Sequence, residues 1–109
     1  MTAADPIARA RELLDDLTEP YRWSDAKLLV WLSDAQEAIA ASRPDELLSA
    51  SNTITAIVNL TATGDTTIFG AKWRLAMARF VTGQALMERD EEGNVSRGAA
   101  FLSLFERSL

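Results

Sequence analysis

Apolar residues recur every three or four positions along most of the chain, which is the pattern of amphipathic helices. Four segments show this pattern, at residues 5–19, 24–43, 71–89 and 94–109. The segment between the second and third helices alternates apolar and polar residues with a period of two, which is typical of strands. The pattern therefore predicts a mainly α fold: a compact bundle of about four helices, with a short β-hairpin or extended loop between helices two and three.

The second predicted helix has the clearest boundaries. Ser24 is a good N-cap, and Trp23 before it can pack on Leu28 as a hydrophobic staple. Arg43 precedes Pro44, which disfavours helical geometry and ends the helix. One face is predicted to point inward, with Trp31 widening it: Leu28, Leu32, Ala35 and Ile39.

The first predicted helix begins at Asp5, as N-cap, followed by Pro6 at the first helical position. Glu19 and Pro20 are expected to close this segment. Its inward face is predicted to hold Ile7, Ala10, Leu14 and Leu17, with Leu13 beside them.

The third predicted helix is apolar on two sides, which indicates a central position in the bundle. Gly83 lies in its middle, where glycine costs about 1 kcal/mol relative to alanine. A close crossing by another helix would account for this glycine. The fourth helix is expected to face inward with Phe101, Leu102, Phe105 and Leu109.

The hairpin is predicted over residues 53–69. Threonine, valine and isoleucine favour strands, and Thr63-Gly64-Asp65 is a turn signal from which residues 66–69 could return as a second strand. A helix continuing from Asp45 is the competing interpretation. A lone two-stranded hairpin is marginal in water, so it must pack on its own helices or pair its edge with another chain.

Composition narrows the chemistry. The 109 residues suit a single domain, residues 1–109, and include neither cysteine nor histidine. Thiolate chemistry and zinc–sulfur sites are thereby excluded, and the commonest general base is missing. The net charge of -5 makes a nucleic-acid reader an unfavourable interpretation. We expect no membrane span and no signal peptide, and therefore synthesis in the cytoplasm.

Two local patterns deserve a functional and a structural interpretation. The carboxylate clusters at residues 15–16 and 90–92 could hold a metal or act in acid–base catalysis, but solvated charge at helix ends explains them better. Ser24 and Lys27 fit the S-x-x-K pattern of some acyl-enzymes, although Ser24 is better explained as an N-cap. The tryptophans are expected in the core rather than on a ligand platform. We therefore predict no enzyme activity, no cofactor and no metal.

The sequence R-W-S-D-A-x-L-L-x-W-L-x-D-A-Q-x-x-I, at residues 22–39 and followed by Arg43-Pro44-Asp45, resembles the opening of tailed-bacteriophage head-to-tail adaptor (connector) proteins. An A-R-x-L-L-D-D-like helix between residues 8 and 16 precedes it. A long helix of the kind W-R-x-A-M-A-R-F-V-x-x-Q-A-L follows at residues 73–86. The resemblance covers nearly the whole chain, and residues 22–45 carry its most specific part.

The resemblance implies a structural virion protein located at the head–tail neck. Such proteins form a ring, typically of twelve copies, that binds the portal protein above and a tail or nozzle protein below. The genome passes through the ring without specific binding. This chain lacks the long insertion that some relatives carry before the long helix, so a role in holding tail fibres is not implied.

Two sets of residues would serve this role. Candidate contacts with neighbouring copies, portal or tail are Ile54, Val58, Leu60, Ile68, Phe69, Phe101, Phe105 and Leu109. Candidate acids facing the channel, where they would repel the DNA backbone, are Asp15, Asp16, Glu91 and Glu92. The alternatives are a small bacterial helical interaction module, such as a regulator or antitoxin-like partner, and a carboxylate-dependent metal enzyme.

Overall fold

The computed structural model describes residues 1–48, 56–88 and 94–109 of the chain. These residues form four α-helices: α1 (Ala4–Leu14), α2 (Asp25–Ser42), α3 (Arg74–Glu88) and α4 (Asn94–Ser108). Short 3₁₀ turns, η1 (Pro44–Leu47) and η2 (Ala71–Trp73), follow α2 and precede α3. The prediction of a mainly α bundle is confirmed.

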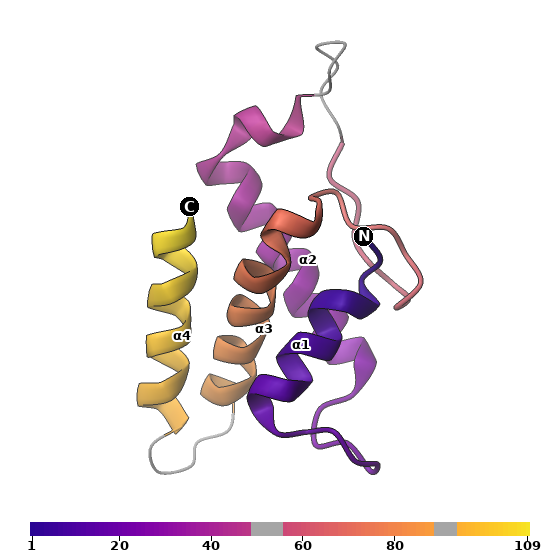
Figure 1. Ribbon diagram of the computed structural model, residues 1–109, viewed down its shortest axis with the longest axis vertical. Coiled ribbons are helices and arrows are strands. Elements are labelled where there is room, and N and C mark those ends of the chain that lie inside the picture. Colours follow the sequence, from indigo (N-terminus) through magenta and orange to yellow (C-terminus); the bar gives the residue numbers. More distant parts are fainter. Residues whose placement is uncertain (49–55, 89–93) are drawn as a thin grey trace.

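Helix α3 is the centre of the bundle. It packs against α1, α2 and α4, whereas the backbone of α4 approaches only α3 among the helices described. Figure 1 shows the result: α1 and α2 cover one side of α3, and α4 lies along the other. The core side chains of α3 include Met77, Val81 and Ala85, all of which are fully buried. The predicted central position of this helix is therefore correct.

Helix α2 matches its predicted boundaries. The Ser24 hydroxyl oxygen accepts a hydrogen bond from the Lys27 backbone N–H at 3.3 Å, and the helix stops before Arg43 and Pro44. The predicted inward stripe of Leu28, Leu32, Ala35 and Ile39 is fully buried. Trp23 is buried as well. The local cap, the proline and the apolar spacing were sufficient to predict this element.

Helix α1 differs from its prediction at both ends. Asp5 is not the N-cap, because helix formation starts at Ala4 and Asp5 lies in the first turn. The helix ends at Leu14, where Asp15 adopts a left-handed conformation (φ 54°) that aspartate tolerates better than most residues. Leu17 consequently lies beyond the helix and is exposed, so the prediction that it faces inward was wrong.

The predicted close crossing at Gly83 is confirmed, and its partner is Gly98 on α4. A methyl group on Gly98 would come within 2.8 Å of the Gly83 carbonyl oxygen and 2.6 Å of Met87 Cγ. A methyl group on Gly83 would similarly meet Leu102 Cγ at 2.8 Å. The two glycines therefore let the backbones of α3 and α4 approach closely. Alongside them, Phe80 and Phe105 pack edge to face with their ring centroids 4.9 Å apart.

The first testable prediction concerns this crossing. Gly98→Val places branched carbons against the Gly83 backbone, so it should lower the free energy of unfolding by about 2 kcal/mol, as overpacking does elsewhere. Gly70→Val is the control, because open space surrounds Gly70. Its effect should stay within about 0.5 kcal/mol. Urea unfolding followed by circular dichroism measures both, and equal stability of the two variants would contradict the close crossing.

Candidate assembly surface

Residues 56–70 run along one edge of the molecule as an extended loop (Figure 1). No strand ladder forms among these residues, and their one bridge joins Thr66 to Thr2 near the N-terminus. The hairpin prediction is therefore not supported in this part, where the alternative of an extended loop applies. The start of the predicted hairpin, including Ile54, lies outside the described residues.

Two buried side chains of α2 hold this loop in place. Gln36 is fully buried; its Nε2 donates to the Val58 carbonyl at 3.3 Å, and its Oε1 accepts from the Ile68 N–H at 2.9 Å. Ser33 Oγ accepts from the Leu60 N–H at 2.9 Å. Backbone groups that a neighbouring strand would bind are thus satisfied by a helix. This contact is the reason the loop lies flat on α2.

The predicted turn at residues 63–65 does form. The Asp65 carboxylate accepts hydrogen bonds from the N–H groups of Thr61 (2.9 Å) and Ala62 (3.1 Å) and from the Thr61 hydroxyl (3.2 Å). These donors, the Thr61 N–H first, lower the pKa of Asp65.

The same turn caps α1. The Thr63 and Asp65 carbonyls accept from the N–H groups of Ala4 (2.9 Å) and Ala3 (2.8 Å), which satisfies donors left open at the helix start. The N-terminal capping of α1 that was predicted for Asp5 is therefore provided by a loop distant in sequence.

These hydrogen bonds decide which loop residues face outward. Leu60 is 6% exposed and Phe69 is buried, so both belong to the core and are not available as contacts with another chain. Their prediction as contact residues was wrong: Ser33 binds the Leu60 N–H, and the Phe69 ring packs beside Trp73 with their ring centroids 6.1 Å apart. Val58 is 63% exposed, and Ile68 is half-buried. Val58 therefore keeps its candidate role.

The exposed part of the loop lies next to α2, where the Val58 carbonyl binds Gln36. The exposed residues of these two segments are here together called the loop patch: Val30, Asp34, Glu37, Ile57 and Val58. The three α2 residues follow one another at spacings of four and three, so they share a helix face. Val30, Ile57 and Val58 are exposed apolar residues. A groove of about 310 Å³ lies beside Val30, Asp34 and Glu37, between α2 and residues 59–61. The loop patch is thus an apolar surface with two acidic side chains.

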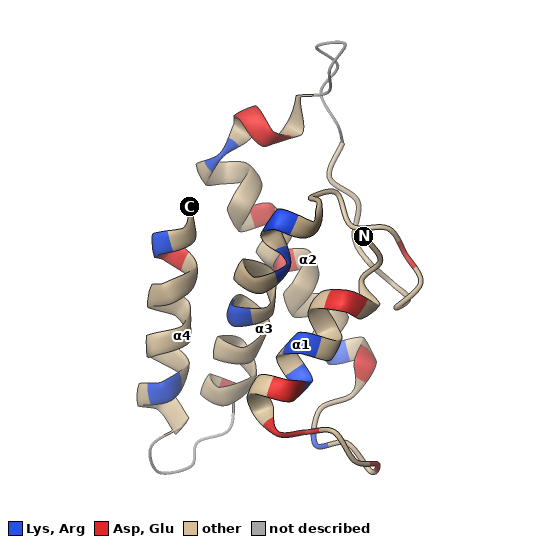
Figure 2. Cartoon of the chain, in the orientation of Figure 1, with Lys and Arg blue, Asp and Glu red and all other residues tan. Residues whose placement is uncertain are grey.

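The opposite edge of the molecule is formed by α4. Its outer face, here called the α4 patch, consists of Arg97, Ala100, Leu104 and Arg107. These residues have spacings of three, four and three, and all of them are exposed. Figure 2 shows the two arginines near the ends of the helix. The α4 patch is thus a shallow surface with an apolar centre and positive ends.

The predicted contacts on α4 lie mostly on its inner side. Phe105 is buried against Phe80, so its prediction as a contact residue was wrong. Phe101 and Leu109 are half-buried and pack against the core.

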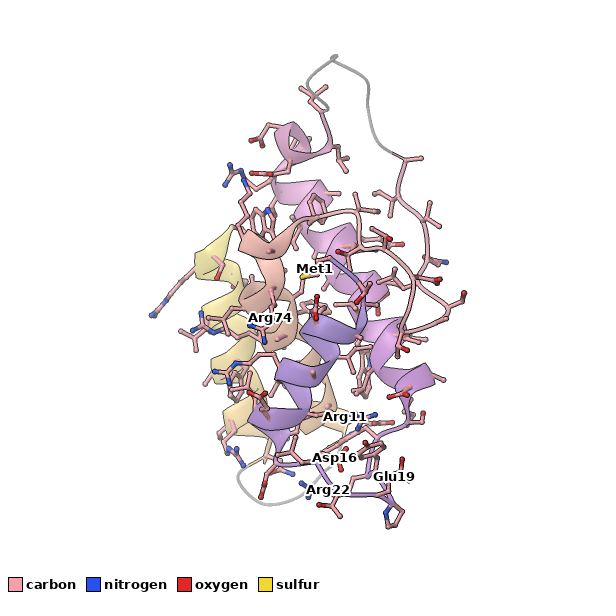
Figure 3. The ribbon with its side chains drawn as sticks, turned by 45° about the vertical axis from the view of Figure 1, so that its right-hand side comes forward. Met1, Arg11, Asp16, Glu19, Arg22 and Arg74 are labelled. Atoms are coloured by element: carbon pink, nitrogen blue, oxygen red, sulfur yellow. The ribbon has the colours of Figure 1, made fainter. Side chains whose placement is uncertain are left out.

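The predicted channel-facing acids also differ from one another. Asp16 is 4% exposed, and its carboxylate accepts from Arg11 Nη1 at 2.8 Å and from the Arg22 N–H at 2.9 Å. An ion-paired, buried carboxylate is not presented to a channel, so that prediction was wrong. Figure 3 shows Arg11, Asp16 and Arg22 close together at the end of α1. Arg11 also binds Asp25 Oδ1 at 2.6 Å, which ties the end of α1 to the start of α2. Asp15 is exposed. Glu91 and Glu92 lie outside the described residues.

The S-x-x-K motif of Ser24 and Lys27 has a structural role. Ser24 caps α2, and the Lys27 ammonium pairs with Glu88. In the part of the chain that the structure describes, no three Asp or Glu side chains gather as a metal site would require. None of the helices described has the length and apolar character needed to cross a bilayer.

Comparisons with protein-family models, with curated proteins and with solved structures give no significant match to this chain.

Sequence reasoning missed the residues that organise this surface. Ser33 and Gln36 are polar residues inside the apolar face of α2, next to Leu32 and Ala35. A buried polar side chain must find hydrogen-bond partners, so their position signalled that backbone from elsewhere packs there. Val30 was missed because a single exposed apolar residue on a helix carries no distinct signal.

The second testable prediction concerns Gln36. Gln36→Leu leaves the Val58 carbonyl and the Ile68 N–H without their partner, so the free energy of unfolding should fall by about 2–4 kcal/mol. Glu37→Leu changes the adjacent, exposed residue and should cost no more than about 0.5 kcal/mol. Hydrogen exchange should show faster exchange of the Ile68 amide in the first variant alone. An unchanged exchange rate of the Ile68 amide would argue against the role of Gln36 in holding the loop on α2.

The third testable prediction concerns pH. Because the folded state lowers the pKa of Asp65, this residue adds stability that is present above its unfolded pKa of about 3.9 and is lost as the pH falls through its folded pKa. Asp65→Asn should therefore be less stable than the parent chain at pH 7. The difference in urea midpoint should shrink below pH 4. Thr61→Val keeps both backbone donors to Asp65, so it should lose less stability at pH 7 than Asp65→Asn. A difference that is the same at pH 7 and pH 2 would exclude this linkage.

Proposed function

We propose that this chain is a structural, non-enzymatic assembly protein, a head-to-tail adaptor of a tailed bacteriophage, which forms a ring beneath the portal and docks the tail. One observation carries the proposal: the chain exposes two different and complementary surfaces at opposite edges, the loop patch and the α4 patch. The resemblance of residues 22–45 to such adaptors adds to it. The neck of the virion would be its location.

The geometry supports ring formation in particular. The molecule measures 48 × 27 × 18 Å, and Figure 1, with the longest axis vertical, shows residues 56–70 and α4 on either side of α3. Rings close through heterologous contacts, in which one face of each copy meets a different face of the next. A contact from edge to edge would place copies side by side with their long axes parallel.

The charges of the two patches agree with this arrangement. The loop patch carries Asp34 and Glu37 around its apolar residues, and the α4 patch carries Arg97 and Arg107 around Leu104. Opposite charges across an interface steer association and set its register. Within this proposal Asp15 remains a candidate for the channel wall, and the genome passes without specific binding. The second candidate function, a helical interaction module, would use the same patches without a ring.

The fourth testable prediction separates these functions. Mass photometry should show rings when the purified chain is mixed with the portal protein encoded by the same genome. Val58→Asp adds charge to the loop patch, and Leu104→Asp does so on the α4 patch. Each should reduce ring formation at least tenfold while circular dichroism remains unchanged.

Ala8→Asp is the matched control, since Ala8 is exposed on α1 and belongs to neither patch. It should form rings as the parent chain does. A parent chain that stays single with the portal protein, or patch variants that assemble like the control, would rule out the adaptor proposal.

A further inference from the structure

A second feature of the surface lies where η1, the start of α3 and the end of α4 meet. A pocket of about 360 Å³ opens there, and Arg43, Glu46, Lys72, Trp73 and Arg79 contribute its polar lining. Three cations and one acid thus share one concavity in a chain whose net charge is -5. Such a local excess of positive charge calls for a chemical explanation.

The acid of the pocket is already engaged. Glu46 Oε1 lies 2.8 Å from Lys72 Nζ and 3.6 Å from Arg43 Nη2, and its side chain is only 17% exposed. Lys72 first, and then the indole of Trp73 and Arg43, lower the pKa of Glu46. Arg43 is occupied further by Asp45 at 3.2 Å and by the Leu109 carbonyl at 3.2 Å. Lys72 and Arg43 thus share the same oxygen of Glu46.

The two remaining donors of the pocket, the Trp73 indole and the Arg79 guanidinium, have different surroundings. Trp73 is 5% exposed, and its buried indole N–H lies close enough to Glu46 to lower the pKa of that carboxylate. Arg79 is half-buried and has no carboxylate of the described chain within ion-pair distance. Arg79 is therefore the cation of this pocket whose charge no described carboxylate balances, and an anionic group from outside the chain would complete the site.

We propose that this pocket binds a carboxylate, supplied by an acidic side chain of a polypeptide partner. A carboxylate offers two oxygens in the geometry that the Arg79 guanidinium binds in a bidentate manner, and one oxygen can also accept from a neighbouring N–H. Leu75 and Ala76 line the same pocket and suit the aliphatic part of a glutamate or aspartate side chain.

Charge balance favours a carboxylate over a phosphate. Glu46 lines the pocket and Asp45 lies beside Arg43, so a dianion would meet two negative groups at close range. A singly charged group is repelled less. Nucleic acid is disfavoured for the same reason and by the net charge of the chain. The inference does not depend on ring formation, because a partner of a simple interaction module could use the same pocket.

The experiment is an NMR titration of the full chain labelled with ¹⁵N. The chain has three tryptophans, hence three indole N–H signals, and Trp73→Phe assigns one of them. The probes are the peptide Ac-Ala-Ala-Glu-Ala-Ala-NH₂, its glutamine counterpart and inorganic phosphate, at constant ionic strength. The glutamate peptide should shift the Trp73 indole and Arg79 Nε signals in a saturable way, with a dissociation constant on the order of 10 mM, as expected for so small a ligand.

Arg79→Gln should weaken this binding at least tenfold, whereas Arg97→Gln, which alters an exposed arginine on α4, should leave it unchanged. Three outcomes would overturn the proposal: no shift at Trp73, equal shifts with the glutamine peptide, or tighter binding of phosphate than of the glutamate peptide. If Trp73→Phe does not fold, triple-resonance assignment identifies the indole signal in the parent chain. If the parent chain binds the glutamate peptide but forms no rings with the portal protein, the result would count against the adaptor proposal alone.

Discussion

The hydrogen bonds from Ser33 and Gln36 to the loop at residues 56–70 are the constraint on which the surface of this protein depends. An extended segment outside a sheet has backbone groups that need partners, and burial against a helix is possible only when those partners exist. Ser33 binds the Leu60 N–H, and Gln36 binds groups of Val58 and Ile68. With the backbone fixed in this way, Leu60 points into the core while Val58 points out, and the loop patch follows.

Local chemistry predicted the helices well wherever the signal and its effect lie close together in sequence. Ser24 caps α2 three residues before its donor, and Pro44 follows directly after its end. Gly83 signalled a close crossing, since a glycine inside a helix costs stability unless packing requires it. The start of α1 was less predictable, because carbonyl groups of residues 63 and 65 satisfy its first donors. Such a cap is local in space and distant in sequence.

The same distinction explains the errors about the candidate surface. A period of two indicates an extended backbone, but it does not show which segment binds the backbone N–H and C=O groups. Here α2 and the N-terminus bind them instead of a second strand. As large apolar residues, Leu60, Phe69 and Phe105 were reasonable contact candidates, yet all three are buried in the core. Asp16 was predicted to be on the surface, but its partner Arg11 lies in the last turn of α1 and its other donor, Arg22, lies in the loop before α2. Burial of a charge depends on such pairings, which spacing alone does not reveal.

The distribution of the remaining charges bears on how copies of the chain could meet. Arg11 is buried and forms ion pairs within the molecule. Arg97 and Arg107 are exposed along α4, whereas Asp34 and Glu37 are exposed in the loop patch. A symmetric dimer through the α4 patch would bring arginines near arginines, and one through the loop patch would bring acids near acids. Both arrangements set like charges against each other around small apolar centres, whereas an edge-to-edge contact in a single direction pairs opposite charges. The charge pattern thus favours the heterologous contact that a closed ring requires over the isologous contact of a dimer.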